Sequence, residues 1–202
     1  MHNFSKYEQN YPLFMVKNIA IFASGSGSNA ENIILFFKNS AFFTFPIIIS
    51  NKQDAYVHER AKALRIPSVT FAKDDFSKPD KILQLLKSYH IDYIVLAGFL
   101  LKVPSEIIQA FPNKIINIHP ALLPKYGGKG MYGHHVHEAV KAAGEKESGI
   151  TIHYVNENYD EGNIIFQAKC RIDENDTPDD IAEKVHELEY SFFPKVIEEV
   201  FE

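Results

Sequence analysis

Cysteine, tryptophan and long apolar segments are scarce or absent in this chain. A single cysteine, Cys170, among 202 residues excludes an internal disulfide framework and a cysteine-rich metal site. No segment approaches the ~18–20 uninterrupted apolar residues of a transmembrane helix, so no membrane partner is expected. These absences are typical of a protein of the reducing cytosol, and we expect a cytoplasmic location.

An excess of positive charge is also missing. The chain has 21 Lys and Arg against 26 Asp and Glu, for a formal net charge of -5. Nucleic-acid-binding domains usually present a basic surface, so nucleic acid is not an expected partner. Residues 1–16 lack the apolar core and the cleavage site of a signal peptide. We interpret 1–16 as an N-terminal extension and 17–202 as one domain.

Strand-like apolar segments alternate with helix-like patterns along most of the chain. This alternation predicts a single α/β domain with an open, twisted, Rossmann-like sheet, mostly parallel, and helices on both faces. Two late strands separated by Asn, Asp and Gly predict an antiparallel pair in the C-terminal part. The predicted strands are 18–23, 46–50, 68–71, 93–97, 114–119, 149–155 and 164–172. The predicted helices are 29–39, 55–64, 79–89, 104–111, 136–143 and a last one that begins after Thr177.

The last helix has a clear start and an interruption. Thr177 is the expected N-cap, with Pro178 in the first helical position and two acids in the first turn. Pro194 lies well inside the same segment and removes a backbone N–H donor. The sequence therefore predicts a kink or a division of the helix at Pro194.

Polar residues gather where a buried strand ends. The segment Ile115-Ile116-Asn117-Ile118-His119 is β-branched and stops at Pro120. Strand side chains alternate, so Asn117 and His119 share one face. In open α/β sheets, ligands bind at the carboxyl ends of the strands. Two satisfied polar groups at an ordinary strand end are an equally good interpretation of this spacing. Asp160, in a later loop, is by itself most simply a turn residue.

A glycine-rich turn follows the first predicted strand. Ser24-Gly25-Ser26-Gly27-Ser28-Asn29 opens the first helix, where backbone N–H groups and the helix dipole favour an anion. Gly25-x-Gly27-x-x-Ala30 matches the dinucleotide fingerprint, but the acid expected about 20 residues later is missing. A single phosphate is therefore favoured over NAD, with an ordinary strand–helix turn as the alternative.

Three clustered histidines raise the question of a metal. His134, His135 and His137 lie close together, but no His-Glu-x-x-His pattern accompanies them. We expect no metal, and we interpret the cluster as a solvated loop and helix start beside a ligand cleft.

Taken together, the motifs resemble the folate-dependent phosphoribosylglycinamide formyltransferases (GAR transformylases) of the formyltransferase group. The resemblance covers the chain from about residue 17 to its end, which makes 17–202 a formyltransferase domain. The motifs that carry it are Ala23-Ser24-Gly25-Ser26-Gly27-Ser28-Asn29, Leu96-Ala97-Gly98-Phe99, Asn117-Ile118-His119-Pro120-Ala121-Leu122-Leu123-Pro124 and Tyr159-Asp160-Glu161-Gly162.

The resemblance implies an enzyme of purine biosynthesis. It would transfer the formyl group of 10-formyltetrahydrofolate directly to the amine of glycinamide ribonucleotide (GAR), through a tetrahedral intermediate and without a metal. The catalytic residues would be Asn117, His119 and Asp160, with Asp160 keeping the His119 imidazole protonated. We expect a monomer or a homodimer, because the sequence leaves the oligomeric state open.

The resemblance also assigns binding residues. Its arginine for the folate tail has Lys78 as the nearest counterpart, and Leu100-Leu101-Lys102 replaces a common Met-Arg pair. The loop 127–133 is lengthened, and its glycines suggest a lid. The residues implied for GAR and its phosphate are Gly27, Ser28, Asn29, His186, Glu187, Leu188 and Glu189. Those implied for the folate are Lys78, Leu100, Leu101, Lys102, Val103, Asn117, Asn156, Glu157, Asn158, Tyr159 and Asp160.

Three other functions share part of this pattern. A methionyl-tRNA formyltransferase would need a further C-terminal domain and a basic surface for tRNA. A formyltetrahydrofolate hydrolase would carry an N-terminal regulatory domain, for which residues 1–16 are too short. A non-catalytic phosphosugar-binding module would explain the glycine turn but not the combination of Asn117, His119 and Asp160.

Overall fold

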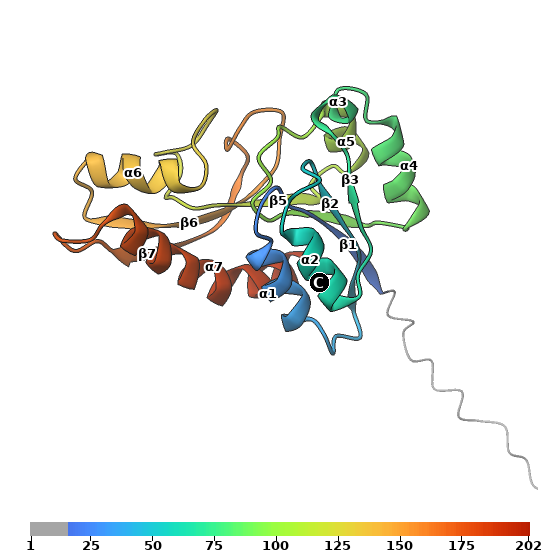
Figure 1. Cartoon of the computed structure of the whole chain (residues 1–202), viewed down its shortest axis with the longest axis horizontal. Helices are drawn as coiled ribbons and strands as arrows, with labels where there is room; N and C mark the ends of the chain where they lie inside the picture. The colour runs from blue at the N-terminus through green and yellow to red at the C-terminus, as the bar shows by residue number, and fades with distance from the viewer. Residues whose placement is uncertain (1–15) are drawn as a thin grey trace, which may run out of the picture.

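The computed structural model describes residues 16–202, so nearly all of the predicted extension 1–16 lies outside the described residues. The described part contains seven strands and seven helices (Figure 1). The strands are β1 (Lys17–Phe22), β2 (Phe43–Ser50), β3 (Ser68–Thr70), β4 (Tyr93–Leu96), β5 (Ile115–His119), β6 (Glu147–Tyr154) and β7 (Ile164–Arg171). The helices are α1 (Ser28–Phe36), α2 (Val57–Leu64), α3 (Lys73–Phe76), α4 (Asp80–Ser88), α5 (Ser105–Ala110), α6 (His134–Ala142) and α7 (Pro178–Phe201).

The strands form one sheet in the order β3-β2-β1-β4-β5-β6-β7. Strands β1 to β5 pair in parallel, whereas β6 pairs antiparallel with both β5 and β7. The predicted fold class, including the antiparallel pair in the C-terminal part, is confirmed. Because β1 lies between β2 and β4, the chain changes direction across the sheet there, and such a switch point opens a crevice at the carboxyl ends of the strands.

Helices cover both faces of the sheet, and each face has its own apolar core. Side chains of α1, α2, α6 and α7 pack in one core cluster with Ile19, Ile21 and Ile116 of the sheet. Side chains of α3, α4 and α5 pack in a second cluster on the opposite face, with Phe22 and Ile94. Figure 1 shows α3, α4 and α5 grouped together on one side of the sheet, with α1, α2 and α7 on the other.

Strand β2 begins earlier than predicted because the sheet accommodates Pro46. The register against β1 pairs Thr44 with Asn18 but Ile47 with Ala20, so two residues of β2 oppose one residue of β1. This bulge is a position where a proline does not remove a ladder hydrogen bond. The sequence pattern also did not predict the short helix α3, which is rich in charged residues.

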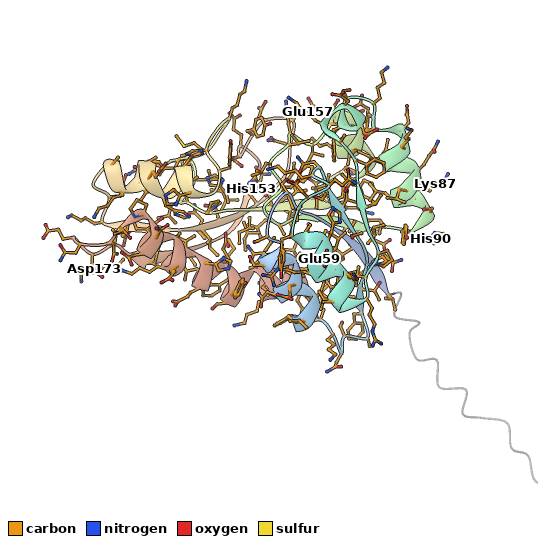
Figure 2. All side chains as sticks on the ribbon, in the orientation of Figure 1. Glu59, Lys87, His90, His153, Glu157 and Asp173 are labelled. Carbon is orange, nitrogen blue, oxygen red and sulfur yellow. The ribbon has the colours of Figure 1, made fainter. Side chains whose placement is uncertain are left out.

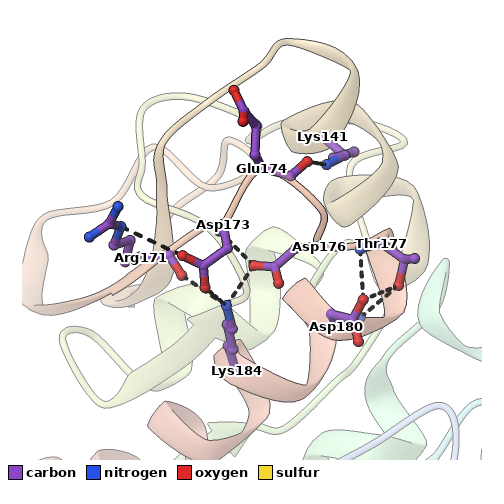
Figure 3. A network of polar contacts seen from close by, with 8 residues as sticks. All are labelled: Lys141, Arg171, Asp173, Glu174, Asp176, Thr177, Asp180 and Lys184. Carbon is purple, nitrogen blue, oxygen red and sulfur yellow. Dashed lines mark hydrogen bonds and ion pairs between the residues drawn. The ribbon is translucent and has the colours of Figure 1, made fainter.

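The start of α7 is fixed by a polar network (Figure 3). Thr177 Oγ1 accepts a hydrogen bond from the Asp180 backbone N–H at 3.2 Å, and the Asp180 carboxylate accepts one from the Thr177 N–H at 2.7 Å. Lys184 pairs with Asp173 at 3.0 Å and with Asp176, on the turn that leads from β7 into the helix. The predicted N-cap and first-turn proline are confirmed.

The sequence predicted a kink or a division at Pro194. The division is wrong, because α7 runs from Pro178 to Phe201 with Pro194 inside it, and the kink stays a prediction. A proline at this position leaves the carbonyl of Tyr190 without its usual helical donor. Asn32 Nδ2 on α1 donates to that carbonyl at 3.1 Å. The packing of α1 against α7 therefore replaces the missing hydrogen bond. None of the helices in 16–202 is both long and apolar enough to cross a membrane.

Candidate active site

A cleft of about 890 Å³ opens at the carboxyl ends of β1, β4 and β5, at the switch point of the sheet. The turn after β1 lines it with Gly25 to Asn29, and the turn after β4 with Ala97 to Leu100. Residues 117–120, at the end of β5, form its centre. The loop 128–133, the start of α6 and one side of α7 complete the walls. A mixed apolar and polar cavity of this size suits small-molecule substrates.

Asn117 and His119 enter the cleft from the same face of β5, as the alternation predicts. Both line the cleft, while Ile116 and Ile118 pack in the core cluster that contains α1 and α7. The β-branched residues thus hold the strand against the core, and its two polar side chains point toward the cleft. His119 is only 3% exposed, so any reacting group it meets is largely removed from water.

Both ring nitrogens of His119 are engaged. Nε2 lies 2.7 Å from the Tyr126 carbonyl oxygen, which can only accept, so Nε2 carries a proton. Nδ1 lies 3.6 Å from Asp160 Oδ2, an ion-pair distance when the imidazole is protonated. Burial lowers the pKa of His119 below its ordinary value, although the Asp160 carboxylate and the Tyr126 carbonyl act in the opposite direction. Asp160 therefore offsets part of the cost of charging this imidazole, but not all of it.

Asp160 is held in place by the loop around it. Its Oδ2 accepts a hydrogen bond from the Gly128 N–H at 2.9 Å, and its backbone has a positive φ of 56°. Burial raises its pKa, but His153, His119 and the Gly128 N–H together bring the pKa of the Asp160 carboxyl below its ordinary value. Two residues later, a Cβ at Gly162 would lie 1.7 Å from the Tyr154 carbonyl oxygen, so the turn requires glycine there.

His153, which the sequence reasoning did not select, completes this polar group. It lies on β6 directly opposite Asn117, and Figure 2 shows it at the centre of the molecule. Its Nδ1 donates to the Tyr154 carbonyl at 2.9 Å, which leaves Nε2 to accept from Asn117 Nδ2 at 3.1 Å. Nε2 also lies 3.6 Å from Asp160 Oδ1. His153 is 2% exposed and outside the cleft lining, and its hydrogen bond in the site is with Asn117, which it can orient.

The glycine-rich turn has the geometry of an anion site. Gly27 caps α1 with a φ of 73°, and a Cβ there would lie 2.4 Å from Val57 Cγ2. Only glycine fits both conditions. The turn places the N-terminal N–H groups of α1, beginning with Ser28 and Asn29, at the wall of the cleft. Free N–H groups at a helix N-terminus favour a phosphate.

A carboxylate from α7 meets this turn. Glu189 Oε2 accepts a hydrogen bond from Asn29 Nδ2 at 2.8 Å and lies 2.9 Å from His186 Nδ1. Residues 186 and 189 are three positions apart, so they share one face of the helix. Glu189 is 9% exposed. A buried carboxylate beside an anion-binding turn suits a ligand that carries a phosphate together with hydroxyl or amine groups.

The cleft brings together part of the predicted set of residues. Among the predicted residues, those that line it are Gly27, Ser28, Asn29, Leu100, Asn117, His119, Tyr159, Asp160, His186 and Glu189. Those outside its lining are Lys78, Leu101, Lys102, Val103, Asn156, Glu157, Asn158, Glu187 and Leu188. Val103 packs in the core cluster that contains α5, and Leu188, on α7, packs against the other core cluster. Residues 16–202 contain no group of three or more His, Cys, Asp or Glu side chains placed to hold a metal ion.

Comparison with known proteins agrees with this geometry. Residues 17–197 match the formyl transferase family model. The chain is 41% identical to the chloroplastic phosphoribosylglycinamide formyltransferase of Arabidopsis thaliana, over 90% of this chain and 64% of that protein. It is 37% identical to the phosphoribosylglycinamide formyltransferase of Bacillus subtilis, over 92% of this chain and 95% of that one. It therefore spans less than two thirds of the Arabidopsis relative but almost all of the bacterial one.

Solved structures show the same similarity. The crystal structure of phosphoribosylglycinamide formyltransferase from Streptococcus pneumoniae superimposes with a TM-score of 0.82 at 35% identity. The match covers 93% of this chain and 100% of that one. The fold of this chain is therefore that of a known family. The chain belongs to the formyl transferase family and, within it, to the phosphoribosylglycinamide formyltransferases.

Proposed function

We propose that this protein transfers the formyl group of 10-formyltetrahydrofolate to the amine of GAR, in de novo purine biosynthesis. The products are formyl-GAR and tetrahydrofolate. The observation that carries the proposal is the content of one cleft. Asn117, His119 and Asp160 meet at its centre, and the anion-binding turn at the start of α1 meets Glu189 at its wall. One site thus offers the groups for formyl transfer and those for a ribonucleotide.

The ribonucleotide would bind along the α1–α7 side of the cleft. Its phosphate would lie on the N–H groups of Gly27, Ser28 and Asn29. Its ribose and glycinamide would extend along the first half of α7, where Glu189 and His186 line the cleft. Glu187 and Leu188 belong to the same predicted segment, but they face away from the cleft lining, and we assign them supporting roles.

The folate would occupy the opposite side, between the turn after β4 and the loop before β7. Leu100 supplies an apolar wall, and the 156–160 backbone supplies polar groups for the amino and amide edges of the pterin. The other residues predicted for the folate are close in sequence to those that line this side of the cleft. They are Leu101, Lys102, Val103, Asn156, Glu157 and Asn158. Lys78 is exposed and lies before α4, where it could meet only the distal end of a folate tail.

The chemistry requires stabilisation of a developing oxyanion. Attack of the amine on the formyl carbon converts its carbonyl oxygen into an oxyanion, and each aimed donor is worth roughly 3 kcal/mol. One Asn117 N–H is bound to His153, which orients the amide and leaves its other N–H for the oxyanion. His119, charged beside Asp160, is the second donor and the acid that protonates the leaving N10.

The surroundings of His119 determine how readily its imidazole gains and loses a proton. Burial disfavours the imidazolium, so the proton is held loosely and is readily given to N10. The Asp160 carboxylate 3.6 Å from Nδ1 keeps the charged form accessible. The Nε2 proton, now donated to the Tyr126 carbonyl, would exchange that acceptor for the substrate.

Formyl transfer from 10-formyltetrahydrofolate to GAR, followed by the absorbance of the folate product, tests the proposal. The wild type is compared with His119→Ala and with His135→Ala, an exposed histidine on α6 that does not line the cleft. We expect GAR-dependent turnover that falls by about 10² or more in His119→Ala and stays at the wild-type level in His135→Ala. Folate turnover without GAR would indicate a hydrolase. Absence of turnover in folded wild type would reject the proposal.

A further inference from the structure

His137 is a buried histidine of the cleft to which none of the roles above has been assigned. It lies on α6, lines the cleft and is 6% exposed. Its Nδ1 is buried and has no hydrogen-bond partner within residues 16–202. A buried polar atom without a partner costs free energy, so such atoms are rare in folded proteins and often mark functional sites.

Groups from both halves of the site affect the pKa of His137. Burial lowers the pKa of its imidazole below the ordinary value, Glu189 on α7 acts in the opposite direction, and His134 on α6 and His119 on β5 lower it further. His137 lines the same cleft as His119, at the formyl end, and Glu189, at the ribonucleotide end. The other titratable side chains lining the cleft are Lys129, Tyr132, Tyr159, Asp160, Glu183 and His186.

We propose that His137 is the base that takes the proton from the glycinamide amine as it attacks the formyl carbon. The inference rests on the proposed function and names a group for a step that Asn117, His119 and Asp160 do not cover. An amine that attacks a carbonyl becomes cationic, and it must lose a proton before the other carbon–nitrogen bond can break. The acceptor must be neutral, desolvated and close to the amine.

The amine nitrogen forms a bond to the formyl carbon, and the carbonyl electron pair moves to oxygen. The amine proton passes to an imidazole nitrogen of His137, and the neighbouring Glu189 carboxylate stabilises the resulting imidazolium. The oxyanion then re-forms the carbonyl, the carbon–N10 bond breaks with its electron pair on N10, and N10 takes a proton from His119. His137 later returns its proton to solvent, and His119 is reprotonated.

The bases at the formyl and ribonucleotide ends of the cleft, His119 and Glu189, already have partners. His119 Nε2 donates to the Tyr126 carbonyl, and its Nδ1 faces Asp160. Glu189 Oε2 contacts both Asn29 Nδ2 and His186 Nδ1. His137 makes no hydrogen bond through its ring among the described residues, so its imidazole is free to accept a proton.

Two substitutions at His137 test the proposal in the full chain, with matched substitutions at His135 as controls. His137→Gln keeps a polar group of similar size without a titratable nitrogen, and His137→Ala leaves space for free imidazole. We expect kcat with GAR to fall by about 10² in both variants, while KM for both substrates changes little. Added imidazole should raise the rate of His137→Ala but not that of His137→Gln. His135→Gln and His135→Ala should match the wild type.

Each outcome decides between structural, binding and catalytic roles. Wild-type kcat in His137→Gln would overturn the proposal, and so would a raised KM for GAR at unchanged kcat, because that result means binding only. A fall in kcat that tracks a lowered thermal unfolding midpoint, without imidazole rescue, would mean a structural role and would also overturn it. Turnover by wild type but no defect in the variants rejects His137 alone, whereas inactive wild type rejects the proposed function itself.

Discussion

Asn117 and His153 face each other across β5 and β6, and their hydrogen bond shows how a side chain outside the cleft can control one inside it. The Tyr154 carbonyl fixes the proton of His153 on Nδ1, so Nε2 becomes an acceptor. The 3.1 Å contact to Asn117 Nδ2 then determines which way the amide points. An amide rotated by half a turn would present an oxygen to the oxyanion, and that contact is repulsive.

His153 should therefore matter for rate rather than for binding. In His153→Ala, Asn117 loses its partner, and we expect kcat to fall roughly ten- to hundredfold because a small misplacement of a catalytic group is costly. KM should change little. His153→Gln, whose amide oxygen can accept from Asn117, should recover part of the loss. Equal kcat values for His153→Ala and wild type would show that Asn117 needs no support from His153.

The sequence predicted which side chains of β5 face the cleft, but it did not predict which residues of other elements surround them. Alternation along a strand places Asn117 and His119 on one face without knowledge of any other element. Asp160 and His153 come from loops and strands that reach the site only through the pairing of β5 with β6, and register across an antiparallel pair is invisible in local sequence. The interpretation of the histidine cluster as solvated is wrong for His137, which is buried. Its burial depends on how α6 docks, which the sequence pattern does not contain.

The residues predicted to bind the folate illustrate the same limit. Of the segment 100–103, only Leu100 lines the cleft, because the chain turns away after β4 and buries Val103 beneath α5. A resemblance in sequence identifies the segment, whereas the direction of each side chain depends on the local turn. Whether Lys78 meets a folate tail and whether the loop 127–133 closes both stay predictions.

Among the elements, α7 connects the most parts of the molecule. It packs against α1, α6, β6 and β7, and it carries His186 and Glu189 into the cleft. Its N-cap was predictable because Thr177, Pro178 and Asp180 form a local signal. Its continuity through Pro194 was not, because Asn32 on α1 supplies the replacement donor from 158 positions away in the sequence. Tertiary packing here overrides a local rule, as it does at Pro46 in β2.

The N-cap of α7 should contribute to stability with little effect on catalysis. Thr177→Ala removes the hydroxyl that accepts from the Asp180 N–H, a loss worth about 1 kcal/mol. In a chain of this size, that loss lowers the thermal unfolding midpoint by about 2–4 °C. His186 and Glu189 lie more than two turns further along α7, so kcat at a low temperature should be unchanged. Thr177→Ser keeps the acceptor and should melt close to wild type. An unchanged midpoint in Thr177→Ala would show that water replaces the cap at no cost.

For the whole molecule, the periodicity of the sequence predicted the fold class, and the switch point of the sheet predicted where the cleft lies. Alternating strands and helices leave few topologies, because parallel crossovers are nearly always right-handed. The position of the cleft then depends on the strand order alone. The composition of the chain, acidic with one half-buried cysteine, is compatible with this fold but does not select it.

Burial of two histidines in one cleft predicts how the stability of the whole protein depends on pH. The pKa values of His119 and His137 are lowered mainly by burial, so the unfolded chain, with histidine pKa near about 6.5, binds protons more readily than the folded one. The free energy of unfolding therefore rises with pH below about 6.5 and levels off above it. We expect the thermal unfolding midpoint of wild type to fall as the pH is lowered from about 7 to about 5. His137→Gln removes one of the two groups and should fall less steeply, whereas His135→Gln should follow wild type. Parallel curves for wild type and His137→Gln would mean that His137 titrates alike in the folded and unfolded chains.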